Sequence, residues 1–143
     1  MEQPYIPDER YIDVAAALII ENNTILVGKR SLSEKYAGKW EFPGGKVEQG
    51  ETPEACLKRE IREELSCDIE INSLFLVSVH DFGREDKKQY RFFSFLCSGM
   101  KGDMVLTAHD EIAWTPFERL LDVEFIDADK VIAKNILAVL GKK

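Results

Sequence analysis

Three glutamates stand close together in the segment REIREEL, which spans residues 59–65. Glu60, Glu63 and Glu64 would fall within about one turn of a helix, where like charges at i,i+4 spacing are unfavourable by a few tenths of a kcal/mol. Such a cluster either lies on a solvated face or holds a cation. Carboxylate oxygens are ligands that Mg²⁺ takes in proteins, usually together with waters and the phosphates of a substrate.

The helical phase of these acids bears on this choice. At about 100° per residue, an apolar stripe is formed by Leu57, Ile61 and Leu65. Glu60 and Glu64 lie beside this stripe, and the basic residues fall largely on the opposite side. Partly buried carboxylates this close together cannot all stay ionised without a counter-charge. From spacing alone, a metal site and a tolerated acidic face both remain open.

The loop before this helix favours the cation site. Residues 43–45, Pro-Gly-Gly, let the backbone approach a ligand closely, and a free carbonyl there would complete a metal shell. Glu51 precedes the helix, at the positive end of its dipole. Arg59 and Glu63 are i,i+4 partners, so the guanidinium can fix the orientation of one carboxylate.

Strand and helix patterns are mixed along the chain without a regular βαβ alternation. Strands are predicted at residues 13–21, 24–29, 69–80, 90–97 and 111–114. Asn22-Asn23 suits a tight hairpin, because both residues tolerate positive φ. These patterns predict an α+β fold, with an α/β/α sandwich around a central mixed β-sheet.

Capping residues predict three helices. Thr52 and Pro53 begin a helix that ends near Leu65. A brief helix is expected to begin at residues 115–116, Thr-Pro, and a last one, ending near residue 141, to be capped by Asp127 or Asp129.

Length and composition set the class of protein. The 143 residues fit one domain, residues 1–143. A net charge of −7 without a basic block argues against an extended nucleic-acid surface. The sequence contains neither a run of about 18 apolar residues nor a signal-peptide pattern, so we expect no membrane partner and a cytoplasmic location. Three cysteines without a CxxC pair indicate reduced thiols.

The stretch GKVEQGETPEACLKREIREELSC, residues 45–67, resembles the Nudix box, G-x5-E-x7-R-E-U-x-E-E-x-G-U with U aliphatic. The matching residues are Gly45, Glu51, Arg59, Glu60, Ile61, Glu63 and Glu64. Ser66 replaces the glycine of the pattern and Cys67 replaces its last aliphatic residue. The segment KRSLSEKYAGKWEFPGGKVEQGET is similar to the MutT-like branch of the family, which hydrolyses nucleoside triphosphates.

This resemblance implies a Nudix fold and a set of site residues. Glu60, Glu63 and Glu64, with the Gly45 carbonyl, would hold Mg²⁺ or Mn²⁺. Arg59 would orient a carboxylate. Glu51 would support the loop or lie behind the metal ligands. Relatives differ in which acid acts as general base, so that role does not transfer.

Four further residues are candidates for the substrate or the reaction. By resemblance, Arg30 contacts the nucleotide, against the alternative of a surface cation at a strand end. Phe42 packs beside the base or in the core. Asp129 hydrogen-bonds the base edge or caps the last helix. Glu111 is an extra ligand or base, or an exposed acid at a strand edge.

The resemblance therefore implies a metal-dependent pyrophosphohydrolase that converts a nucleoside triphosphate into a monophosphate and pyrophosphate. The expected substrates are 8-oxo-dGTP or CTP/dCTP. Alternatives are a nucleoside diphosphate derivative such as ADP-ribose, or a nucleotide sensor without catalysis. Homodimers occur in the family, so a homodimer is an open alternative, although no stretch of the sequence identifies an interface.

Overall fold

The computed structural model describes residues 4–33 and 35–141. Its strands are β1 (Tyr11–Glu21), β2 (Thr24–Arg30), β3 (Trp40–Glu41), β4 (Gly44–Lys46), β5 (Asp68–His80), β6 (Gln89–Lys101) and β7 (His109–Pro116). Its helices are α1 (Pro53–Leu65), the 3₁₀ helix η1 (Phe117–Asp122) and α2 (Asp127–Leu140). The described residues contain no helix that is long and apolar enough to cross a membrane.

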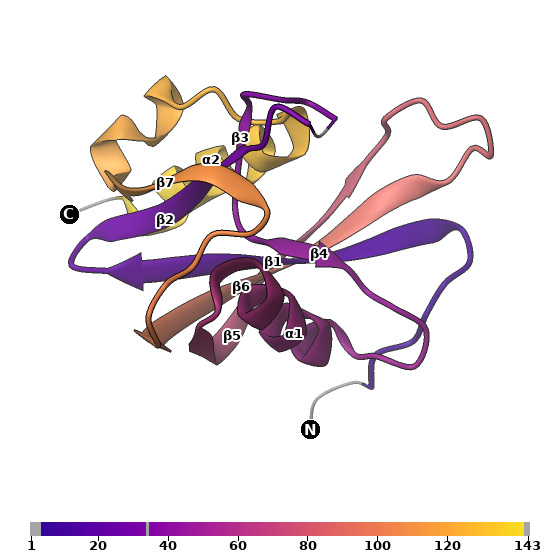
Figure 1. Cartoon of the computed structure of the whole chain (residues 1–143). Coiled ribbons are helices and arrows are strands. Elements are labelled where there is room, and N and C mark those ends of the chain that lie inside the picture. Colours follow the sequence, from indigo (N-terminus) through magenta and orange to yellow (C-terminus); the bar gives the residue numbers. More distant parts are fainter. Residues whose placement is uncertain (1–3, 34, 142–143) are drawn as a thin grey trace.

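The strands form one mixed sheet with β1 at its centre (Figure 1). The order is β3-β2-β1-β6-β5, and β4 and β7 pair with β1 and β2. β1 runs parallel to β6 and antiparallel to β2 and β4. β1 and β6 are far apart in the sequence, so the central pairing brings the two halves of the chain together.

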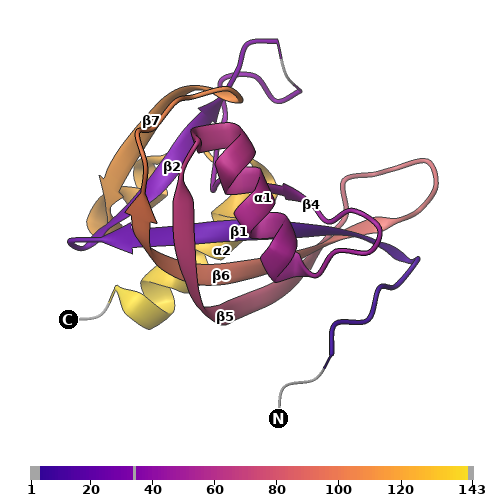
Figure 2. The same cartoon turned by 60° about the horizontal axis from the view of Figure 1, so that its bottom comes forward.

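Helices cover both faces of the sheet (Figures 1 and 2). Under α1, one apolar cluster joins helix residues such as Leu57 and Ile61 to Ala15 and Phe95 of the sheet. Under α2, a second cluster joins Ile132 and other helix residues to the opposite face. The predicted α/β/α sandwich around a mixed sheet is confirmed, because each helix buries one apolar stripe on its own side.

Local signals placed the α1 segment correctly. The Thr52 hydroxyl accepts a hydrogen bond from the Ala55 amide at 3.2 Å, and Pro53 occupies the first turn. Asn22 and Asn23 both have positive φ in the hairpin between β1 and β2. Ser66, which replaces the glycine of the box, ends α1 in the left-handed region with φ 57°.

The beginning of α2 differs from the prediction. Its N-cap is Ile126, which makes no capping hydrogen bond through its side chain, so neither Asp127 nor Asp129 caps the helix. Asp129 is instead turned inward, where its carboxylate accepts a hydrogen bond from the Phe42 amide at 2.8 Å. A buried backbone N–H must find an acceptor, and this requirement outweighs capping here.

Other differences concern the ends of elements. β6 extends to Lys101 and β7 covers His109–Pro116, so both exceed their predicted ranges. The loop before α1 also contains the short strand β4, which pairs with β1. This pairing fixes the backbone at Gly45 beside α1.

Candidate active site

The three box glutamates lie at different depths on α1. Glu64 is 8% exposed, Glu60 is partly buried and Glu63 is exposed. Gly45 on β4 lies directly against the Glu60 carboxylate, and a Cβ atom at this position would clash with it. A glycine is therefore required where β4 passes the acidic face of the helix.

Arg59 ties the outer acids together. Its Nε lies 2.7 Å from Glu51 Oε2, and its Nη1 lies 2.7 Å from Glu60 Oε1 and 3.1 Å from Glu63. Its Nη2 also donates to the Lys46 carbonyl at 3.3 Å. The guanidinium therefore fixes two carboxylates of α1 relative to the loop that carries Gly45. It also holds the pKa of Glu51 down to about 2.

Glu64 lies in a different electrostatic environment. Its carboxylate accepts a hydrogen bond from the Gly44 amide at 3.3 Å, and no described lysine, arginine or histidine pairs with it. Burial, followed by the nearby Glu41 and Glu60 carboxylates, raises the pKa of Glu64 to about 9. Burial also raises the pKa of Glu60, against the lowering effect of Arg59.

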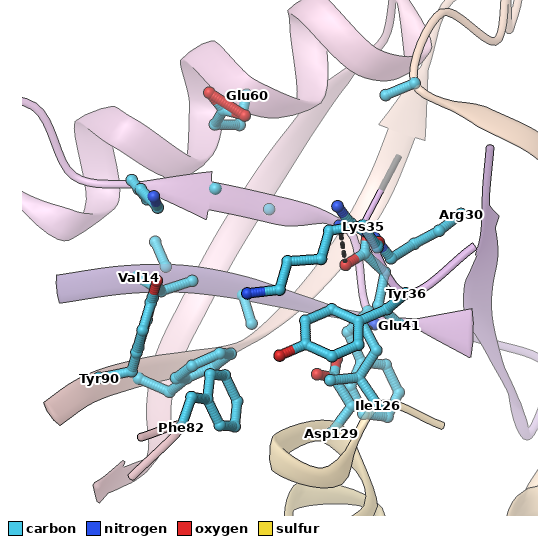
Figure 3. Close-up of a pocket in the computed structure, with 18 of the residues that line it drawn as sticks. Val14, Arg30, Lys35, Tyr36, Glu41, Glu60, Phe82, Tyr90, Ile126 and Asp129 are labelled. Carbon is cyan, nitrogen blue, oxygen red and sulfur yellow. Dashed lines mark hydrogen bonds and ion pairs between the residues drawn. The ribbon is translucent and has the colours of Figure 1, made fainter. Parts of the chain in front are cut away.

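A cavity of about 820 Å³ opens at this place. Figure 3 shows Glu60 on α1 at one end, Asp129 on α2 at the other, and Lys35 and Tyr36 between them. Seven predicted site residues line it: Arg30, Phe42, Gly45, Glu60, Glu63, Glu64 and Asp129. The structure therefore brings the predicted metal residues and the predicted substrate residues into one cavity.

At the α2 end of the cavity, the carboxyl group of Asp129 lies close to Phe42. Phe42 is 3% exposed and packs on Phe125 with ring centroids 5.0 Å apart, so it belongs to the core as well as to the cavity wall. Asp129 is 4% exposed. Burial raises its pKa to about 8, although the hydrogen bond from the Phe42 amide opposes this shift.

Aromatic and basic side chains from the loops 31–39 and 81–88, and from β4 and β6, complete the cavity. Phe82 and Tyr90 pack with ring centroids 5.0 Å apart, and Tyr36 lies 6.4 Å from Phe82. Lys35, Lys46 and Arg84 also line the cavity. Sequence reasoning missed the aromatic set, because nothing local indicates that the loops at 31–39 and 81–88 face each other.

One wall of the cavity holds a second group that sequence reasoning missed. Glu41 Oε1 accepts a hydrogen bond from Arg30 Nη1 at 2.9 Å, and Glu41 Oε2 lies 2.9 Å from His109 Nε2. Trp40 and Phe42 flank Glu41 in the sequence. The sequence did offer one signal: Glu41 stands between two aromatic residues, just before Pro-Gly-Gly. Because alternate residues of a strand face opposite sides, Glu41 points away from the side that its aromatic neighbours face.

Two of the remaining predicted residues lie behind the cavity and one lies away from it. Glu51 and Arg59 do not line the cavity: Arg59 contacts Glu60, which does, and Glu51 contacts Arg59. Glu111 is exposed on β7, in register with Lys29 of β2, and does not line the cavity. It therefore corresponds to the alternative of an exposed acid at a strand edge.

The residues present suit a hard divalent cation. Glu64 is buried and Glu60 is partly buried, both lie against the Gly44–Gly45 backbone, and among the described residues Glu64 has no ion-pair partner. Oxygen donors of this kind are those that Mg²⁺ and Mn²⁺ prefer. Among the described residues, no three acidic, histidine or cysteine side chains form a ready-made cage. Waters and substrate phosphates would therefore have to complete the shell.

Comparison with known proteins decides the family. The sequence profile described as the NUDIX domain matches residues 11–136, which is most of the chain. The chain belongs to the Nudix family. Its box residues are those gathered around Arg59 and Gly45, and the chain is an enzyme of the Nudix hydrolase class.

Relatives with assigned names extend over most of the chain. A Mycobacterium tuberculosis protein named "Putative 8-oxo-dGTP diphosphatase 2" is 32% identical over 120 residues, covering 82% of this chain and 82% of that protein. The CTP pyrophosphohydrolase of Escherichia coli is 29% identical over 131 residues, covering 91% of this chain and 94% of that protein. Both resemble the chain outside the Nudix box as well as within it.

Solved structures confirm the Nudix fold. The solution structure of the E. coli ORF135 protein has a TM-score of 0.80 and 26% sequence identity, covering 93% of this chain and 94% of that one. A MutT protein from Methanosarcina mazei has a TM-score of 0.77 and 26% identity, covering 93% and 96%.

Proposed function

We propose that this Nudix hydrolase is a metal-dependent nucleoside triphosphate pyrophosphohydrolase, which releases a nucleoside monophosphate and pyrophosphate. One observation carries the proposal. A single cavity has buried carboxylates and the Gly45 backbone at one end, and Asp129 with aromatic rings at the other. A nucleoside triphosphate has the same polarity, with an anionic chain that needs cations and a flat base that needs stacking.

Hydrolases of this family generally use divalent metal ions. Glu60, Glu64 and the Gly45 carbonyl would hold Mg²⁺ or Mn²⁺ here, with Glu63 at the exposed edge. When bound, the ion would neutralise phosphate charge and make a water molecule a better nucleophile.

The protein's own groups would hold and orient the substrate. Arg59 keeps Glu60 and Glu63 in place, through hydrogen bonds of 2.7 and 3.1 Å. Lys35, Lys46 and Arg84 supply positive charge along the cavity, where the phosphate chain would lie. Water would then attack phosphorus, the bridging P–O bond would break, and the proton would pass to a carboxylate. Positioning and charge stabilisation would supply most of the rate.

The base end suits two kinds of base. Asp129 Oδ2 accepts from the Phe42 amide, and a pKa of about 8 lets the carboxyl group be protonated or ionised near neutral pH. The protonated form donates to a base carbonyl, and the ionised form accepts from an exocyclic amino group. We therefore propose 8-oxo-dGTP or CTP/dCTP as substrate, in agreement with the names of the two relatives.

The first experiment is a substrate panel with Mg²⁺, containing CTP, dCTP, 8-oxo-dGTP and ADP-ribose. Pyrophosphate and orthophosphate are measured separately. Pyrophosphate from one triphosphate, well above the others, would support the proposal and name the base. If only ADP-ribose is hydrolysed, the proposed substrate class is wrong, whereas the proposed metal site still stands.

A matched pair of variants tests the metal end. Glu64→Gln should lower turnover by about 100-fold or more, because it removes one charge that holds the cation. Its melting temperature should not fall, since the variant also removes a buried acid with a raised pKa. Glu54→Gln, on the exposed side of the same helix, should behave like the wild type. Equal turnover of both variants would remove Glu64 from the site.

A further inference from the structure

His109 is buried with one polar partner. Its side chain is 0% exposed, and its Nε2 lies 2.9 Å from Glu41 Oε2. Within the described part of the chain, its Nδ1 has no hydrogen-bond partner. An ionised carboxylate only accepts, so Nε2 is the donor in this contact. An apolar residue would fill this space without an unpaired nitrogen, so packing alone does not account for histidine here.

The ring reaches Glu41 by crossing strand β2 at a glycine. Gly28 of β2 is in register with Glu41 on β3 at one side and with Ile112 on β7 at the other. A Cβ atom at Gly28 would lie 2.6 Å from His109 Cδ2, so only glycine leaves room for the ring. The β2–β7 register is irregular between Lys29 and Arg30. Irregularities of this kind re-aim side chains next to active sites.

Glu41 connects His109 to the residues of the cavity wall. Its Oε1 accepts from Arg30 Nη1 at 2.9 Å, the contact drawn as a dashed line in Figure 3. Arg30 Nε in turn donates to the Lys35 carbonyl at 2.7 Å. Lys35 and Tyr36 belong to the loop that covers the cavity. A continuous series of hydrogen bonds therefore runs from the buried ring to the cavity loop.

We propose that His109 is a positioning residue, which fixes the Glu41 carboxylate and, through Arg30, the loop that binds the nucleotide. The inference rests on the proposed function, because nucleotide affinity is its readout. Loss of the Nε2 donor would leave Glu41 free to turn, and the Arg30 tether to the loop would loosen. Because Glu60 and Glu63 belong to α1 and are held separately by Arg59, we expect the effect to fall on KM more than on kcat.

Three substitutions at one position separate the hydrogen bond from packing. His109→Gln keeps an amide N–H close to the place of Nε2, whereas His109→Asn keeps a donor only near Nδ1. His109→Leu keeps apolar volume and no donor. With the triphosphate that is hydrolysed best, His109→Leu and His109→Asn should each raise KM about tenfold. This is the effect expected when one hydrogen bond to a charged group is lost. Gln should stay within about threefold of the wild type, and kcat should change less than about threefold in all three.

A double-variant cycle tests whether His109 acts through Glu41. If it does, His109→Leu combined with Glu41→Gln should have the same KM as Glu41→Gln alone. Fully additive effects, an unchanged KM in His109→Leu, or equal KM values for Gln and Asn would each overturn the inference. Gly28→Ala should reproduce the KM of His109→Leu, because it displaces the ring.

Two readouts do not need turnover. The ¹⁵N chemical shifts of the His109 ring should show the Nε2-protonated neutral form and should change in Glu41→Gln. Calorimetry with CTP should show weaker binding by His109→Leu than by the wild type. If the wild type hydrolyses no triphosphate, the proposed function fails, and these two measurements still decide the role of His109. An unchanged ring spectrum in Glu41→Gln would overturn it.

Discussion

Replacing Asp129 by asparagine should make the stability of the protein less dependent on pH. Asp129 is 4% exposed, and burial raises its pKa from 3.8 to about 8. A group whose pKa is higher in the folded state binds its proton more tightly there. Its contribution to stability is therefore fully present below pH 3.8, is lost as pH rises towards about 8, and stays constant above.

The magnitude follows from the same two pKa values. At about 1.4 kcal/mol per pH unit, the rise from pH 3.8 to pH 7 removes about 4 kcal/mol of this contribution to stability. For a chain of 143 residues, about 1 kcal/mol corresponds to about 3 °C in melting temperature. Asparagine can still accept the hydrogen bond from the Phe42 amide, so Asp129→Asn removes the charge and keeps the contact.

The assay is thermal unfolding of the wild type and Asp129→Asn between pH 4 and pH 9. The melting temperature of the variant minus that of the wild type should increase by about 6 °C or more over this range. Asp127→Asn, at the exposed first turn of the same helix, should show no such increase. A difference between Asp129→Asn and wild type that stays constant with pH would refute the reasoning, because it would mean that Asp129 titrates normally in the folded protein.

Three further predictions follow from particular residues. Ser66→Gly should stabilise the protein by about 1 kcal/mol in thermal unfolding, because Ser66 has φ 57°, and an unchanged or lower melting temperature would contradict this. Glu111→Gln should leave kcat and KM close to wild-type values in the pyrophosphate assay, because Glu111 lies outside the cavity; a loss beyond about tenfold would restore it as a site residue. Phe82→Leu should raise KM by about tenfold with little change in kcat, because a ring beside the base would be lost, and an equal fall in kcat would argue against stacking.

The acidic end of the cavity could be predicted from the sequence because its geometry is local. Glu60, Glu63, Glu64 and Arg59 belong to one helix, so a period of 3.6 residues fixes their relative positions. The same period correctly separated buried Glu64 from exposed Glu63. Capping and turn chemistry placed the beginning of α1 and the first hairpin.

The end of the cavity that contains Asp129 depends on contacts between residues far apart in the sequence, which no local pattern indicates. Asp129 was proposed by resemblance, but its contact with the Phe42 amide joins residues 87 positions apart. Glu41 and His109 are 68 positions apart, and they meet only because Gly28 lies between them in the folded sheet. His109 has no partner near it in the sequence, so the sequence alone does not indicate its role.

The pairing of β1 with β6 has a consequence for how the protein is made. β1 ends at Glu21, and its parallel partner β6 begins only at Gln89, so the centre of the sheet cannot close until most of the chain has left the ribosome. The hairpin of β1 and β2 and the helix α1 need shorter segments. The acidic half of the site can therefore assemble early, while the half that contains Asp129 waits for α2. Under the proposed function, the residue assigned to the base therefore reaches its place only after the residues assigned to the cation.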